Sequence, residues 1–157
     1  MVTEKPRSPW ALIVVQLALT AMAIPSGIVL ILDPTGVSIG AQSMLSHLHQ
    51  FLPFLQDFTT VGIFLLVVYG LLPIGLSYGL WTQKRAAWVL TILLGVTEIV
   101  WIAAEIAMFY PLGFIFFYPL KAGMGVLTLS LCLQPSVRTF YSSRVELAQK
   151  ESLKTTN

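Results

Sequence analysis

The segment Thr97-Glu98-Ile99-Val100-Trp101-Ile102-Ala103-Ala104-Glu105 places two carboxylates inside a long apolar run, residues 86–109. A third ionisable residue, Lys121, lies inside the next apolar run. Ionisable groups at bilayer depth are costly unless they are paired or hydrated, and they commonly mark a functional site. The segment therefore predicts a helical membrane protein with a polar site inside the bilayer.

The composition of the whole chain supports this reading. Of its 157 residues, 56% are hydrophobic and 10% are charged, and the mean hydropathy is +0.81. A soluble domain carries about 25% charged residues, so most of this surface is not expected to face water. The single cysteine, Cys132, excludes an internal disulfide, a cysteine metal cluster and CxxC redox chemistry.

Four apolar segments are candidates for membrane spans, which need about 20 residues each. We expect an all-α polytopic bundle of four transmembrane helices forming one domain, residues 1–141, followed by a basic cytoplasmic tail, residues 142–157. The expected spans are residues 10–32, 58–81, 86–109 and 114–133. Ala21-Met22-Ala23 resembles a signal cleavage site, but the apolar run continues past it, which favours a first span.

Prolines and turn residues subdivide these segments. Pro25 and Pro73 each lie inside an apolar run, where a missing N–H predicts a bend of the helix. Asp33-Pro34-Thr35-Gly36 is a turn signal that ends the first span. The link Thr82-Gln83-Lys84-Arg85 is short enough to predict a tight helical hairpin.

Between the first two spans, residues 39–54 mix apolar and polar side chains. The apolar ones recur at helical spacing, which predicts an amphipathic helix on the membrane surface, ended near Pro53. His47 and His49 are two residues apart, so on a helix they diverge by about 200° and do not converge on one metal ion. We therefore expect no metal and no cofactor, with ligation of a pigment in a larger complex as the alternative for these histidines.

The basic residues fix the expected orientation. Eight of the nine Lys and Arg residues lie before the first span, between spans two and three, or after span four, and the ninth is Lys121. The long connection, residues 33–57, contains none. The positive-inside rule then places both termini of a multi-pass cell-membrane protein in the cytoplasm.

Glu98 and Glu105 are seven residues apart, so they share one face of a helix with Trp101 between them. From the outer end of the helices, Glu105 should lie about 6 Å deep, Lys121 about 12 Å and Glu98 about 16 Å. Lys121 is thus able to reach either carboxylate. A structural ion pair, a hydrated pocket or proton relay, and contact with a partner protein or lipid headgroup are the three readings.

Other polar and small residues complete the predicted membrane interior. Gln16, Thr20 and Tyr69 are placed to hydrogen-bond the Glu98 side chain, a type of contact worth about 0.6 kcal/mol on average. Four glycines are predicted at helix-packing faces: Gly75, Gly79, Gly123 and Gly125.

Three motifs resemble a family of small four-helix integral membrane proteins of prokaryotes that has no assigned function. They are Leu32-Asp33-Pro34-Thr35-Gly36, then Gly79-Leu80-Trp81 with Lys84-Arg85-Ala86-Ala87-Trp88, then Pro135-Ser136-Val137-Arg138 with Phe140-Tyr141. The likeness extends over residues 10–141. It implies the four-helix fold and brings no catalytic residue with it.

Two classes of function follow from these residues. The first is a structural or accessory subunit of a larger membrane assembly, with membrane-protein partners or copies of itself. The alternative is a proton-linked or small-solute transporter built around Glu98, Glu105 and Lys121. The sequence contains no P-loop, GxSxG or HExxH motif, which disfavours an enzyme, and its basic tail is too sparse for nucleic acid.

Overall fold

The computed structural model describes residues 7–109 and 118–142, and every regular element in these ranges is a helix. Three of the described helices are long and apolar enough to cross a membrane: Pro9–Leu32, Thr59–Trp81 and Arg85–Met108. The prediction of an all-α protein with membrane-length helices is therefore confirmed. A fourth apolar helix, Pro119–Leu133, is shorter, and the predicted start of its span at residue 114 lies outside the described residues.

The long helices form two pairs. Helix α1 (Arg7–Leu32) packs along a continuous helix made of α3 (Thr59–Phe64), η2 (Leu65–Leu71) and α4 (Leu72–Trp81). Large apolar side chains on the outside of this pair, such as Val14 and Ile63, are at least half-exposed. Lipid is the environment that suits such a surface.

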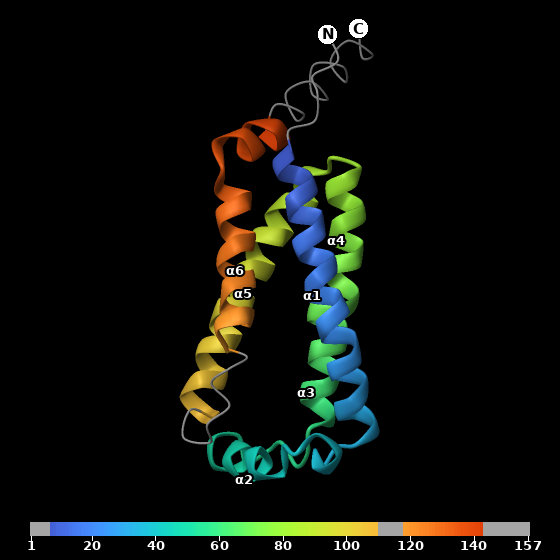
Figure 1. Ribbon diagram of the computed structural model, residues 1–157, viewed down its shortest axis with the longest axis vertical. Coiled ribbons are helices and arrows are strands. Elements are labelled where there is room, and N and C mark those ends of the chain that lie inside the picture. Colours follow the sequence, from blue (N-terminus) through green and yellow to red (C-terminus); the bar gives the residue numbers. More distant parts are fainter. Residues whose placement is uncertain (1–6, 110–117, 143–157) are drawn as a thin grey trace, which may run out of the picture.

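The second pair is α5 (Arg85–Phe109) with α6 (Tyr118–Leu133). The two pairs meet at the end of the bundle that carries the turn between α4 and α5, called the hairpin end below, and they separate toward the opposite end (Figure 1). There α2 (Gln42–Phe51) lies across the bundle, and this is called the α2 end.

The second long helix changes its winding in the middle. Segment η2 is π-helical, and the N–H of Leu72 donates to the carbonyl of Val67, five residues back. Pro73 follows directly and has no N–H to offer to Tyr69, which favours the wider turn. The structure therefore has a π-helical segment beside the predicted bend at Pro73, and Thr20 Oγ1 ties it to α1 through a 3.0 Å hydrogen bond to the Gly70 carbonyl.

Hydrogen bonds organise the connection between α1 and α3. Asp33 accepts from Thr35 Oγ1 at 2.6 Å and from the Ser38 N–H at 2.7 Å. These bonds to the ionised carboxylate lower the pKa of Asp33 to about 2. The Phe58 N–H donates to the Pro34 carbonyl at 2.9 Å, which joins the two ends of the connection.

Helix α2 occupies the centre of the predicted amphipathic segment. It is shorter than residues 39–54 because Gly40, with φ 68°, separates it from a 3₁₀ turn, Val37–Ile39, and because Leu52 leaves the helical conformation ahead of Pro53. Leu48 is buried, and neighbouring apolar side chains of α2 pack on Leu30 and Phe58. The apolar face of α2 thus covers the α2 end of the bundle.

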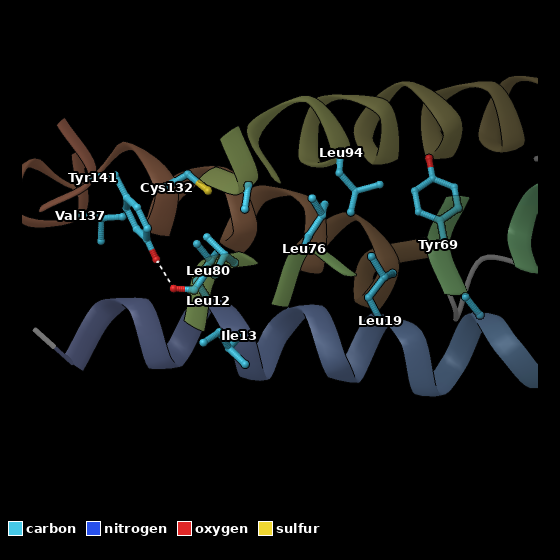
Figure 2. Packing of buried hydrophobic residues seen from close by; sticks show 12 residues of the cluster. Leu12, Ile13, Leu19, Tyr69, Leu76, Leu80, Leu94, Cys132, Val137 and Tyr141 are labelled. Carbon is cyan, nitrogen blue, oxygen red and sulfur yellow. Dashed lines mark hydrogen bonds between the residues drawn. The ribbon is translucent and has the colours of Figure 1, made fainter. Parts of the chain in front are cut away.

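At the hairpin end, a helical segment formed by residues 135–142 folds back onto the bundle. The Tyr141 hydroxyl donates to the Leu80 carbonyl at 3.0 Å, and Tyr141 and Val137 are fully buried (Figure 2). Trp88 donates from Nε1 to the Cys132 carbonyl at 3.1 Å. Residues 143–157, the remainder of the predicted tail, lie outside the described part of the chain.

Glycines allow a close backbone contact between α1 and α3. A Cβ built on Gly27 would lie 2.8 Å from the Gly62 carbonyl oxygen, and one built on Gly62 would lie 2.9 Å from the Gly27 carbonyl oxygen. Real Cβ atoms do not approach other atoms this closely. Only glycine at both positions therefore allows α1 and α3 to cross with their backbones in contact.

The four glycines predicted at packing faces divide into two groups. Gly79 meets Ala87 of α5, and Gly125 of α6 meets Ile99. Gly75 and Gly123 have nothing within 4 Å of an added Cβ among the described residues, so no described helix packs closely against these two, and their packing role stays a prediction. For Gly75 the reason is that α4 and α5 touch beside their turn and then separate (Figure 1).

We expect Gly62→Leu to destabilise the protein and Gly75→Leu to leave it unchanged. The added side chain at Gly62 collides with the α1 backbone, and overpacking of this kind costs about 1–3 kcal/mol. The Gly75 variant adds the same side chain where nothing lies within 4 Å. Thermal unfolding in detergent makes the comparison, and equal midpoints for the two variants would contradict the assigned contact.

Candidate functional site: a cavity with a charged wall

The separation of the two helix pairs leaves a cavity of about 810 Å³ at the α2 end. Its lining comes from α1, α3, α5 and α6, and α2 adds Met44 and Leu48. Most lining side chains are apolar. The volume lies within the range of roughly 300–1,000 Å³ that is typical of ligand-binding pockets.

One wall of this cavity is charged. Lys121 Nζ lies 3.2 Å from Glu105 Oε1 and 3.1 Å from Oε2, and Trp101 Nε1 donates to Glu105 Oε1 at 2.7 Å. The Glu105 carboxylate thus accepts three hydrogen bonds from charged or strongly polar donors. This arrangement favours an ionised, mutually neutralising pair.

Helical spacing explains the geometry of this wall. Trp101 lies four residues before Glu105, so one face of α5 carries both side chains. Lys121 comes from the first turn of the neighbouring α6. Its side chain is 38% exposed and that of Glu105 is 13% exposed, so the lysine is the more accessible partner.

A second, smaller space of about 80 Å³ lies around Glu98. Glu98 is only 4% exposed, and its Oε2 atom has no hydrogen-bond partner among the described residues. Tyr69 lines the same space, and its buried hydroxyl also lacks a partner there. The volume suffices for a few water molecules, since one needs about 10–30 Å³ depending on the measure.

The two spaces share a wall. Five residues line both: Met22, Ser26, Leu65, Trp101 and Lys121. Phe64 faces this region too, with its ring centre 4.7 Å from that of Trp101 and 5.6 Å from that of Tyr69. The buried carboxyl of Glu98 is therefore next to a large apolar cavity and among aromatic rings.

The remaining predicted residues lie elsewhere or bond differently. Gln16 Nε2 donates to Thr128 Oγ1 at 3.4 Å, and Thr20 donates to the Gly70 carbonyl, so neither bonds Glu98. Their side chains instead join α1 to α6 and to η2. Tyr69 alone of the three predicted partners shares a pocket with Glu98.

The two histidines differ in their surroundings. His49 Nε2 lies 3.0 Å from the Gln56 carbonyl, and His47 Nδ1 is buried without a hydrogen-bond partner among the described residues. In the part of the chain that the structure describes, no three His, Cys, Asp or Glu side chains are grouped as metal ligands.

Sequence reasoning did not identify most of the cavity lining, and Trp101, Pro25 and Ala21 are instructive examples. Trp101 was placed between the two carboxylates, and its i, i+4 relation to Glu105 was the signal for the hydrogen bond. Pro25 and Ala21 both line the cavity, and Pro25 cannot supply the N–H that the Ala21 carbonyl would accept in a regular helix.

No family model, no curated protein and no solved structure matches this chain. The resemblance to four-helix membrane proteins therefore stays a prediction from its motifs.

We expect Lys121→Met to destabilise the protein, because Glu105 then keeps a charge in the apolar wall without its cation. Breaking a fully buried pair costs about 3–5 kcal/mol and a surface pair about 0–1 kcal/mol. With Lys121 more than one-third exposed, an intermediate loss of about 1–3 kcal/mol follows.

The double variant Lys121→Met with Glu105→Gln should recover much of that loss, because removing a whole pair is often close to neutral. Thermal unfolding of both variants in the same detergent gives the comparison. A double variant no more stable than Lys121→Met would show that the two residues are not energetic partners.

Proposed function

We propose that this chain is a multi-pass cell-membrane protein that binds a small solute in its cavity and carries it across the bilayer with the help of protons. The observation that supports this most is Glu98. Its carboxyl group is buried, has one oxygen without a hydrogen-bond partner among the described residues, and lies beside a cavity of ligand size. A carboxyl in such a place can take up and release a proton as the cavity fills and empties.

The proposal includes four spans with both termini in the cytoplasm. Helix α6 is apolar, and the sequence extends its apolar run back to residue 114. Lys84 and Arg85 lie at the hairpin end together with residues 135–142, whereas α2 at the opposite end has no Lys or Arg (Figure 1). The positive-inside rule favours a cytoplasmic hairpin end and an external α2 end.

Cysteines placed singly at Gln42 and at Ser152, with Cys132 replaced by Ala, should react with a membrane-impermeant maleimide from opposite sides of the membrane. Labelling of intact cells should reach only Gln42→Cys, and labelling of inverted vesicles only Ser152→Cys. Reaction of both from the same side would exclude four spans.

Access of solutes to the cavity is tested at Ser26. This residue lines both spaces and is exposed to them. In the Cys132→Ala background, Ser26→Cys should react in intact cells with at least one of a cationic and an anionic methanethiosulfonate reagent. Val14→Cys is the control, since Val14 is on the same helix and 62% exposed but lines neither space. We expect it to face lipid and to stay unmodified.

If Ser26→Cys is as inert as Val14→Cys toward both reagents, the cavity does not admit solutes and the proposal fails. The second candidate, an accessory subunit of a membrane assembly, would then be favoured. Its support is the open surface at Gly75 and Gly123, where no atom of the described chain lies within 4 Å of an added Cβ. Small residues on exposed helix faces suit close contact with another helix.

A further inference from the structure

The aromatic and acidic groups around Glu98 indicate which chemical class fits the cavity. We infer that the cavity binds a lipophilic organic cation, with Glu98 as its counter-ion, in exchange for the Glu98 proton. This inference rests on the proposed solute-binding function and adds the charge and polarity of the solute.

The charges around the empty cavity balance one another. Lys121 is held to Glu105 by two contacts and Trp101 adds a third hydrogen bond, so this pair is neutral as a unit. Glu98 is 4% exposed and has an oxygen without a partner in the described part of the chain. An unpaired charge is costly in such a place, so Glu98 holds its proton when the cavity is empty. The empty site therefore carries no net charge.

A cation can replace the proton of Glu98 without changing that balance. The carboxyl O–H bond breaks, the proton leaves to water, and the carboxylate then faces the bound cation. An anion has no comparable place. It would have to displace Glu105 from both Lys121 and Trp101, or be bound together with an extra proton.

The walls match such a ligand in shape and polarity. Trp101 lines both spaces, Tyr69 lines the smaller one and Phe64 the larger one. Aromatic faces attract cations within about 6 Å, more strongly when water is excluded. The apolar lining accommodates the hydrocarbon groups that a lipophilic cation carries, and the cavity of about 810 Å³ leaves room for them.

Other titratable groups near Glu98 do not prevent the exchange of its proton for a cation. Tyr69 comes from η2, Lys121 from α6 and Glu105 from the same helix as Glu98. From α1, the residues that line the pocket are Leu19, Met22, Ala23 and Ser26, none of which titrates. Lys121 is the one cation in this set, and its contacts with both oxygens of Glu105 offset its charge.

Two ions of nearly equal size and shape test the inference: tetraphenylphosphonium, a cation, and tetraphenylborate, an anion. Equilibrium dialysis with the purified full-length protein in detergent should show saturable binding of the cation and at least about tenfold weaker binding of the anion. The affinity for the cation should fall on acidification by up to about tenfold per pH unit, because one proton competes with one cation. Uptake of the cation should also release protons into a weakly buffered solution.

Variants of Glu98 complete the test. Glu98→Gln should keep the thermal midpoint and lose both the affinity and its pH dependence, whereas Glu98→Asp should retain the pH dependence. Equal or tighter binding of the anion, unaltered binding by Glu98→Gln, or no binding of either ion would overturn the inference. The wild-type comparison of the two ions needs no variant, so it decides even if Glu98→Gln fails to fold. If these binding tests fail but Ser26→Cys is still modified, the cation assignment is rejected and the proposal of a solute-binding cavity is retained.

Discussion

The backbone contact between Gly27 and Gly62 is the constraint on which the rest of this structure depends. It holds α1 against α3 so closely that a Cβ on either residue would meet the other helix at under 3 Å. Because α1 lies this close to α3, it does not also fill the space toward α5 and α6 at the same level. The bundle is therefore closed at the hairpin end by Tyr141, Val137 and Leu80, and it is hollow at the α2 end.

The same hollow explains the position of α2. Its apolar face, centred on Leu48, packs over Leu30 and Phe58 rather than over a continuous core. The connection that carries α2 is tied at its base by the Phe58 to Pro34 hydrogen bond and by the hydrogen bonds of Asp33. The order of this connection thus comes from polar contacts at its ends and from apolar contacts along α2.

The sequence predicted the helices well because apolar run length is a direct consequence of bilayer thickness. It also predicted which charges are unusual, and the depth estimate placed Lys121 within reach of both carboxylates; in the structure its partner is Glu105. It could not predict the partners of Gln16 and Thr20. Spacing gives the face of one helix, but the choice between Thr128, Gly70 and Glu98 depends on how the helices cross.

The glycines also show that local spacing does not identify which residues come into contact. The small-xxx-small pattern selected Gly75 and Gly79, yet only Gly79 meets α5, since the two helices separate beyond their turn. Gly27 lies four residues after Ala23, but Gly62 has no small residue at that spacing, and the pattern does not tell which helix Gly27 meets. Contacts between residues far apart in the chain follow from the tertiary arrangement, which local spacing does not encode.

Two carboxylates on one face of α5 have opposite surroundings: the charge of Glu105 is compensated by its neighbours, and that of Glu98 would not be. Glu105 is compensated by Lys121 and Trp101, so its charge is part of the structure. Glu98, seven residues deeper, has Tyr69 and Trp101 in its pocket and an oxygen that no described group satisfies. The π-helical turn before Pro73 contributes to this difference, because Tyr69 belongs to it and reaches toward α5 from there (Figure 2). Glu98 is costly to ionise when it is alone and favourable to ionise beside a cation. Its ionisation would therefore depend on what occupies the cavity, whereas that of the Glu105–Lys121 pair would not.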